Sequence, residues 1–272
     1  MKVACGIVLY NPSQYDVKNI LKYIFYFDKV YIFDNSETEK NKINILAGNI
    51  EQIENIGNNG LSIAYDVMAK KALNDGFDYL ITLDQDSKLD TETISKMIQA
   101  MDNYCDNDKI GIFCPEVFYN KKKVIRSKEN KFVSWCISSG SMINLSLYNK
   151  VVFFDLNYFI DRVDKDFCKQ IIDNGYHICQ VADTELIQQL GESRKRFGLT
   201  VSTHSVLRHY YIARNRMYYN RKYNVCFLVT FLQLVKHLLR VLIFENDKIN
   251  KIKMIIKGIF DYHNNIMGKF NE

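Results

Sequence analysis

The chain has 272 residues, of which 47% are hydrophobic and 25% charged, a composition that excludes a disordered chain and allows a buried core. The net charge of +5 is unevenly distributed: residues 194–272 carry 15 Lys and Arg against 4 Asp and Glu, whereas residues 1–193 have a net charge of −6. A basic tail on an acidic body indicates a polyanionic partner, such as phosphate groups or an anionic lipid surface.

Cysteine usage and the apolar segments indicate the compartment. The seven cysteines include no C-x-x-C pair, which argues against a disulfide framework or a cysteine-based zinc site and for a reducing compartment. The first apolar run ends early at Asn11-Pro12, so no secretory signal is expected. The longest apolar stretch, residues 225–235, is shorter than the roughly 20 residues of a membrane-spanning helix. The sequence therefore predicts a cytoplasmic protein.

Strands and helices alternate through the first half of the chain. Apolar runs typical of buried strands and segments with helical spacing follow one another at residues 3–10 (strand), 16–27 (helix), 29–33 (strand), 61–73 (helix), 79–83 (strand), 91–101 (helix) and 110–113 (strand). Strands that are apolar on both faces indicate a parallel sheet covered by helices. The predicted fold class is α/β, with a mostly parallel, Rossmann-like sheet and helices on both faces.

The second half of the chain is less regular. We predict strand and loop over 124–143, a short helix over 166–174, a strand near 178–182, a charged loop over 192–196, and then basic helices. The predicted organisation is a catalytic domain over residues 1–205 and a basic helical region over 206–272.

Asp84-Gln85-Asp86 follows the buried strand YLITL at residues 79–83. Ligands bind at the carboxyl ends of strands in open parallel sheets. Two neighbouring carboxylates repel each other unless a cation lies between them, and Mg²⁺ or Mn²⁺ prefers such oxygens. A solvated loop or a cap for the following helix is the alternative interpretation.

Two other acidic segments are candidates. Asp34 ends the strand at 29–33, where its carboxylate could accept a hydrogen bond from a pyrimidine base or ribose, or could form an Asx turn. Asp161, Asp164 and Asp166 lie just before a predicted helix. Asp164 is the candidate general base, and a solvated helix start is the competing interpretation.

Arginine and tyrosine alternate in residues 208–216, RHYYIARNR. Arginine can bind phosphate oxygens with two nitrogens, so this segment could stabilise a diphosphate leaving group; a surface helix is the alternative. The acidic body argues against a nucleic-acid partner. The five histidines form no recognisable zinc motif.

In this order and spacing, the segments resemble the inverting glycosyltransferases of family 2, which have the GT-A fold, and within them the bacterial rhamnosyltransferase-type enzymes. The resemblance extends over nearly the whole chain. It rests on VLYN (8–11), DNS (34–36), NNG (58–60), LDQDS (83–87), SSGS (138–141), FIDRVD (159–164), RHYYIARN (208–215) and KGIFDYHNNIMGK (257–269).

The resemblance implies a role for each matching position. Donor binding would fall to Tyr10, Asp34, Asn58, Asp84, Gln85 and Arg214, and Asp86 would hold Mn²⁺ or Mg²⁺. The sugar and acceptor pocket would be formed by Ser139, Gly140 and Asp161, with Asp164 as the catalytic base. The donor would be a dTDP- or UDP-linked sugar, with rhamnose as the first choice. The acceptor would be a glycan or a polyprenyl-linked glycan in cell-surface polysaccharide synthesis.

Three positions depart from the family pattern. Asp66 lies in the helix after the NNG loop, where many members have an Asn-x-Gly; Gln188 stands where many have a histidine; and Val163 precedes Asp164 where a glutamate is common. Two other functions compete with sugar transfer. A nucleotidyltransferase should carry a Gly-rich phosphate loop near the first strand, and Gly6 alone does not supply one. The function of a non-catalytic membrane or polyanion adaptor would not depend on the carboxylates of Asp84, Asp86 and Asp164.

A basic amphipathic helix is expected near the end of the chain. Ile249, Ile252, Ile255, Ile256 and Ile259 share one helical face, with lysines mostly elsewhere. Such a helix could bind the anionic inner face of the bacterial membrane. Packing of the same helix on the catalytic domain is an equal alternative.

Overall fold

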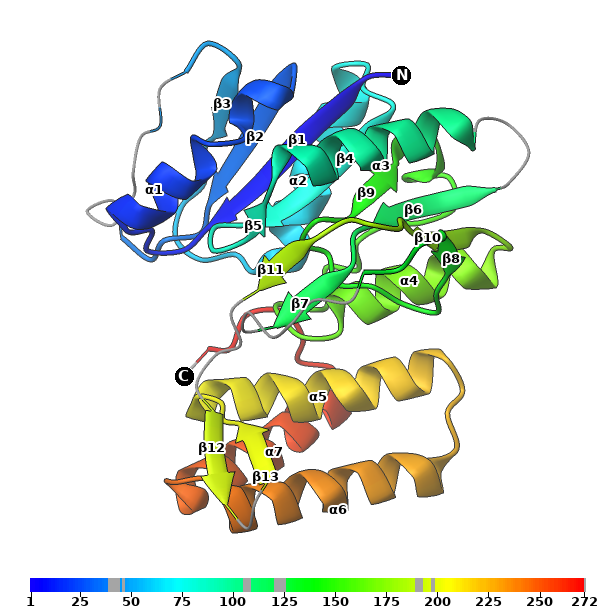
Figure 1. Ribbon diagram of the computed structural model, residues 1–272. Coiled ribbons are helices and arrows are strands. Elements are labelled where there is room, and N and C mark those ends of the chain that lie inside the picture. Colours follow the sequence, from blue (N-terminus) through cyan, green and yellow to red (C-terminus); the bar gives the residue numbers. More distant parts are fainter. Residues whose placement is uncertain are drawn as a thin grey trace. The chain divides into compact units, whose positions relative to one another are not determined.

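The structure is a computed structural model that describes residues 1–38, 45, 47–104, 109–119, 126–188, 193–196 and 199–271. Its contacts divide into two compact units (Figure 1). The first contains Met1–Asp155 and Asp164–Gln189, and the second contains Leu156–Val163 and Leu190–Glu272. The predicted domain boundary between residues 205 and 206 stays a prediction, because a division by contacts does not define which part of the chain folds independently.

An eight-stranded sheet forms the first unit's centre, in the order β3-β2-β1-β4-β9-β6-β10-β8. Strands β3, β2, β1 and β4 are parallel, as are β6 and β10, whereas β9 and β8 are antiparallel to their neighbours. This confirms the mostly parallel sheet. The bounds are β1 (Val3–Leu9), β2 (Lys29–Asp34), β3 (Ile50–Ile53), β4 (Tyr79–Asp84), β6 (Ile110–Cys114), β8 (Lys131–Phe132), β9 (Met142–Asn144) and β10 (His177–Gln180).

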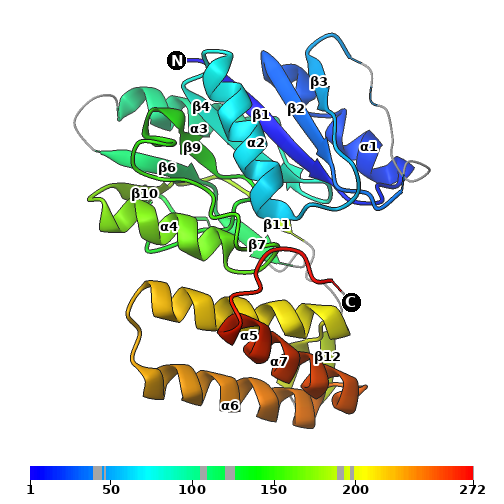
Figure 2. The ribbon, with the colours of Figure 1, turned by 180° about the vertical axis from the view of Figure 1, so that it is seen from behind.

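Helices cover both faces of this sheet. The helices are α1 (Gln14–Ile20), α2 (Leu61–Asn74), α3 (Thr91–Asn103) and α4 (Val163–Asp173), with short 3₁₀ turns η1 (Ile24–Tyr26) and η3 (Leu145–Leu147). α1 and α3 lie over one face (Figure 1), and α2 and α4 lie over the other (Figure 2). Coverage on both sides explains why every residue of β1 is buried.

Several local predictions need correction. The predicted helix over 16–27 is wrong beyond Ile20, where the chain turns into η1. The side chain of Asn49 donates to the carbonyl oxygens of Ile24 (2.8 Å) and Phe27 (2.9 Å), so a distant residue stabilises the turn. The charged loop expected over 192–196 is also wrong, since Ser193–Arg196 forms β12, which pairs with β13 (Leu199–Ser202). A small sheet of β5 (Lys88–Leu89), β11 (Leu186–Gln188) and β7 (Val117–Tyr119) was not predicted.

The second unit is built from α5 (Val206–Lys222), α6 (Phe227–Phe244) and α7 (Lys248–His263), with the β12–β13 hairpin. Ala213, Val241 and Ile255 form a small core that joins the three helices. A Cβ added to Gly258 of α7 would lie 2.5 Å from the backbone oxygen of Tyr210, so α7 packs directly on α5. The helix expected near the end of the chain is therefore α7, and its contact with α5 lies within the second unit; packing on the catalytic domain and binding to a membrane both stay predictions.

Among the described residues, one helix passes a test of length and composition for crossing a bilayer. It is α6, whose 18 residues have a mean hydropathy of 1.8, with 17% of them buried. Its length lies within the range of about 17–25 residues that membrane-spanning helices have. Thr230, His237 and Val241 are buried within the second unit. α6 is thus a largely exposed apolar helix that packs within the second unit through a few buried residues.

Candidate active site

The carboxyl ends of three adjacent parallel strands lead into four of the predicted donor-binding residues, Tyr10, Asp34, Asp84 and Gln85. Asp34 at the end of β2 is paired with Leu9 of β1, and Asp84 at the end of β4 is paired with Val8 of β1. The two carboxylates therefore lie at the same edge of the sheet, one strand apart. Ligands of open α/β sheets bind at this edge.

Tyr10 and Gln85 connect the ends of β1 and β4. The backbone N–H of Tyr10 donates to Gln85 Oε1 (2.7 Å), and Gln85 Nε2 donates to the carbonyl oxygen of Tyr10 (3.2 Å). This pair of bonds fixes the loop after β1 against the loop after β4. The Tyr10 ring stays 47% exposed, so it can contact a ligand.

Asp34 is nearly buried, and only one of its carboxylate oxygens is bonded. Asp34 Oδ1 accepts from the backbone N–H (2.8 Å) and the hydroxyl (2.5 Å) of Ser36, whereas Oδ2 is buried without a hydrogen-bond partner. An unpaired buried acceptor costs about 1–3 kcal/mol, which a donor on a ligand would recover. This position suits recognition of an N–H group.

The loop before α2 is held beside Asp34. The amide of Asn35 donates to the Gly60 carbonyl oxygen (3.1 Å) and accepts from the backbone N–H of Asn59 (3.0 Å). Asn58 Oδ1 accepts from the backbone N–H of Gly60 (3.0 Å), whose φ of 87° lies in the region that favours glycine. The structure thus places Asn58 in the same network of loops as Asp34.

Negative charge accumulates after β4. Burial, and then the charges of Asp86 and Asp164, raise the pKa of Asp84 to about 6. Burial also raises the pKa of Asp86. Among the described residues, Asp84 accepts from the hydroxyl of Tyr65 (3.2 Å) and, weakly, from the amide of Gln188 (3.5 Å). No described Lys or Arg forms an ion pair with either carboxylate.

The turn at residues 138–141 joins the end of β4 to the start of α4. Ser138 Oγ donates to Asp164 Oδ1 (2.6 Å), and Ser139 Oγ accepts from the backbone N–H of Asp84 (3.2 Å). Gly140 has a φ of 78°, and an added Cβ would lie 2.9 Å from Pro115. The turn therefore needs glycine, and it holds Asp164 within electrostatic range of Asp84.

Two predicted site residues belong to the second unit. Asp161 pairs with Arg208 (3.2 Å). Arg214 is fully buried, and all its guanidinium nitrogens donate within that unit, to the side chains of Tyr210 and Asn215 and to the carbonyl oxygens of Ile266 and Gly268. These bonds leave Arg214 little capacity for a ligand, so its role near a diphosphate stays a prediction that this geometry does not support.

Comparison with known proteins identifies the family. The sequence model of Glycosyl transferase family 2 matches residues 17–166. The chain belongs to this family. It is 28% identical to the dTDP-rhamnosyl transferase RfbF of Shigella flexneri over 96% of this chain and 94% of that one. The family assignment makes the chain a nucleotide-sugar glycosyltransferase.

Solved structures share the GT-A fold at low sequence identity. TarS of S. aureus in complex with UDP-GlcNAc has a TM-score of 0.53 and 15% identity, with 98% of this chain and 74% of that one covered. GalNAc-T7 with UDP, GalNAc and Mn²⁺ has a TM-score of 0.57 and 12% identity, with 78% of this chain and 47% of that one covered. At these identities the likeness establishes the fold alone.

Two of the three positions at which this glycosyltransferase departs from the family pattern have different explanations. Asp66 is buried and accepts from Tyr148 Oη (2.8 Å) and Lys70 Nζ (2.8 Å), so it supports the packing of α2. Gln188 instead lies at the site, where its amide is 3.4 Å from Ser87 Oγ as well as near Asp84.

Two site residues, Tyr65 and Ser138, were not predicted from the sequence. The SSGS segment was a signal for Ser138, but nothing in the sequence marked Tyr65.

The carboxylates suit a metal that is shared with a ligand. Among the residues that the structure describes, no three His, Cys, Asp or Glu side chains form a metal cluster. Asp84 and Asp86 together offer two carboxylates, which are hard oxygen donors, in an anionic setting. Mg²⁺ needs only one or two protein carboxylates when phosphate oxygens complete its coordination shell. The residues present therefore fit Mg²⁺ or Mn²⁺ bound together with a diphosphate.

Proposed function

We propose that this glycosyltransferase transfers rhamnose from dTDP-rhamnose to an acceptor hydroxyl, with inversion, in the synthesis of a cell-surface polysaccharide. The similarity to the Shigella flexneri dTDP-rhamnosyl transferase along both chains supports the donor. The observation that carries the reaction is the Ser138–Asp164 bond, because it holds a carboxylate beside the strand ends that carry Asp34 and Asp84.

In this proposal Asp164 removes the proton from the acceptor hydroxyl as that oxygen attacks the anomeric carbon. Ser138 holds one carboxylate oxygen and so orients the base. Asp34 Oδ2 accepts an N–H of the pyrimidine base, and Tyr10 lies against the nucleoside. Ser139 and Gly140 shape the sugar pocket. A divalent cation held by Asp86 and Asp84 would offset the charge of the nucleoside diphosphate.

The acceptor is proposed to be a glycan, either free or polyprenyl-linked. The enzyme would then act in the cytoplasm at the inner face of the bacterial membrane. The exposed apolar residues and basic charge of the second unit support this location.

A thermal-shift series tests the donor and the metal together. The protein is melted with dTDP, UDP or GDP, with and without Mn²⁺ or Mg²⁺. A nucleotide at about 100 times its dissociation constant adds roughly 2.7 kcal/mol to the free energy of unfolding. We expect the largest shift with dTDP and metal together. If only UDP gave a shift, the proposed donor would be a UDP-linked sugar instead. If a folded sample showed no shift with any nucleotide, the proposal would be overturned.

A charge-matched pair of variants locates the metal. Asp86→Asn should abolish the metal-dependent part of the shift, because it removes a carboxylate from the anionic end of β4. Asp102→Asn makes the same chemical change at an exposed position on α3 and should leave the shift unchanged. Equal shifts in both variants would contradict the metal position.

A further inference from the structure

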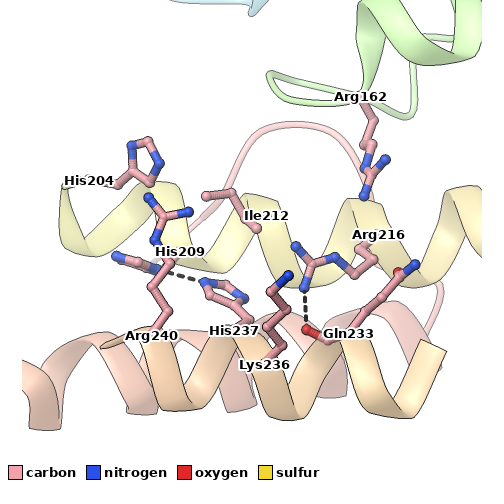
Figure 3. Close-up of a pocket in the computed structure, with 9 residues that line it drawn as sticks. All are labelled: Arg162, His204, His209, Ile212, Arg216, Gln233, Lys236, His237 and Arg240. Carbon is pink, nitrogen blue, oxygen red and sulfur yellow. Dashed lines mark hydrogen bonds between the residues drawn. The ribbon is translucent and has the colours of Figure 1, made fainter. Parts of the chain in front are cut away.

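The second unit contains a cavity of about 280 Å³ lined by four positively charged side chains, Arg162, Arg216, Lys236 and Arg240. Arg216 extends from α5, Lys236 and Arg240 extend from α6, and Arg162 reaches in from the 156–163 segment (Figure 3). The volume is close to the lower end of the range for small-ligand sites, roughly 300–1,000 Å³.

None of these four cations has an ion-pair partner among the residues that the structure describes. The two nearby carboxylates have other partners: Asp161 pairs with Arg208 (3.2 Å), and Glu245 pairs with Lys251 (2.6 Å) and contacts His209 (3.0 Å). Crowding of like charges without counter-ions is costly unless an anion binds.

Arg216 and Arg240 are each fixed by one hydrogen bond and keep further N–H donors. Arg216 donates one bond to the carbonyl oxygen of Gln233 (2.9 Å), and Arg240 donates one to the carbonyl oxygen of Ser202. The Nε atoms of both arginines are buried without a hydrogen-bond partner. Burial, and then the charge of Arg162, lowers the pKa of Arg216 to about 10, which reports the same unfavourable environment for positive charge. Arginine N–H groups of this kind match the oxygens of a phosphate group.

An apolar surface continues from the cavity along α6. Leu232, Lys236, Leu239 and Ile243 follow one another at intervals of three or four residues, so they share one stripe of the helix. The three apolar members are 56%, 51% and 39% exposed. A contiguous exposed apolar stripe beside a cationic cavity is unusual for a surface that faces only water.

We propose that the cavity binds the phosphate group of an anionic membrane lipid, whose acyl chains lie along the exposed stripe of α6. The cationic lining matches the phosphate, and the stripe matches the hydrocarbon that a lipid carries next to it. The interaction is separate from the donor site and does not depend on the identity of the sugar.

Vesicle sedimentation with the full chain tests this proposal. Vesicles contain phosphatidylcholine alone or phosphatidylcholine with phosphatidic acid, in metal-free buffer. We expect binding to the second kind only, and Lys236→Glu should weaken it on the order of tenfold, because each basic residue at an anionic surface contributes substantially. Lys253→Glu makes the same change at an exposed position of α7 outside the cavity and should have a much smaller effect. Equal weakening by both variants would overturn the proposal.

A second variant and a soluble ligand complete the test. Leu232→Ser with Leu239→Ser leaves the cavity's charges intact, and we expect it to lose vesicle binding while keeping a thermal shift with inorganic phosphate. A phosphate shift that Lys236→Glu abolishes, without any vesicle binding by the unmodified chain, would overturn the lipid as the source of the phosphate. Nucleotide-dependent shifts should be the same in all these variants, which separates this site from the donor site.

Discussion

The carboxylates at the sheet edge of the first unit and the guanidinium groups between α5 and α6 are opposite in charge but alike in arrangement. The charges of Asp86 and Asp164 contribute to the raised pKa of Asp84, and the charges of Arg162 and Arg240 contribute to the lowered pKa of Arg216. Each cluster is built into its unit by hydrogen bonds. Both therefore cost stability in the empty protein, and a ligand of opposite charge recovers that cost.

The clusters differ in how the chain assembles them. The acidic cluster comes from strand ends and one turn, where backbone register fixes the spacing of the side chains. The basic cluster comes from the facing sides of two helices and a separate segment, so it depends on helix packing. The acidic cluster is thus visible as short motifs, whereas the members of the basic cluster are scattered over nearly 80 positions, from Arg162 to Arg240.

The largest expected effect concerns the acidic cluster. Asp164→Asn should lower turnover by about 10²–10⁴-fold, because it removes the general base. Donor binding should change little, since Asp164 acts on the acceptor hydroxyl in this proposal and its carboxylate is oriented by Ser138 Oγ (2.6 Å). The measurements are the rate of sugar transfer and the nucleotide-dependent thermal shift.

Asp173→Asn is the matched control for this variant. It makes the same change at the exposed end of the same helix, α4, where Asp173 pairs only with Lys169 among the described residues. Turnover should stay within twofold or so, as for ordinary surface substitutions. Loss of donor binding together with turnover in Asp164→Asn would remove the assignment of the base.

The next effect concerns the buried ion pair between Lys251 and Glu245 in the second unit. Lys251→Ala should lower the free energy of unfolding by about 3–5 kcal/mol, because it leaves the buried Glu245 carboxylate without its 2.6 Å partner. Urea unfolding measures the change, with Lys253→Ala at an exposed position as the control. Equal stability of the two variants would show that the buried Glu245 carboxylate does not need Lys251 as its partner.

The last effect depends on pH and is the smallest when the change over a single pH unit is compared, about 1.4 kcal/mol. Burial, and then the charge of Arg216, lowers the pKa of His237 to about 3 from an ordinary value of 6.5. Below pH 6.5 the unfolded chain therefore binds a proton that the folded protein does not, so stability falls by up to about 1.4 kcal/mol per pH unit as the pH drops toward 3.

His237→Gln isolates this contribution. In phosphate-free buffer, the stability difference between the unmodified protein and the variant should be constant above pH 6.5 and should shift in favour of the variant as the pH falls. Urea unfolding at several pH values measures it. A difference that is independent of pH would mean that His237 is protonated as easily in the folded protein as in the unfolded chain.

Much of the first unit follows from local patterns. The apolar runs predicted β1, β2, β4 and β6, and helical spacing predicted α2 and α3, because these elements are buried along their whole length or on one complete face. Asp84 and Asp86 could be located at a strand end for the same reason. Short strands such as β5 and β12 could not be predicted, since two to four residues have no periodicity to detect.

The sequence by itself determined the alternation of strands and helices, the acidic end of β4 and the basic tail, because each is a property of neighbouring residues. Only the tertiary structure decided that Ser138 holds Asp164, that Arg214 is committed to backbone carbonyls, and that four cations of the second unit share one cavity. Contacts between distant residues depend on how elements pack, and packing is a property of the whole chain and not of any segment.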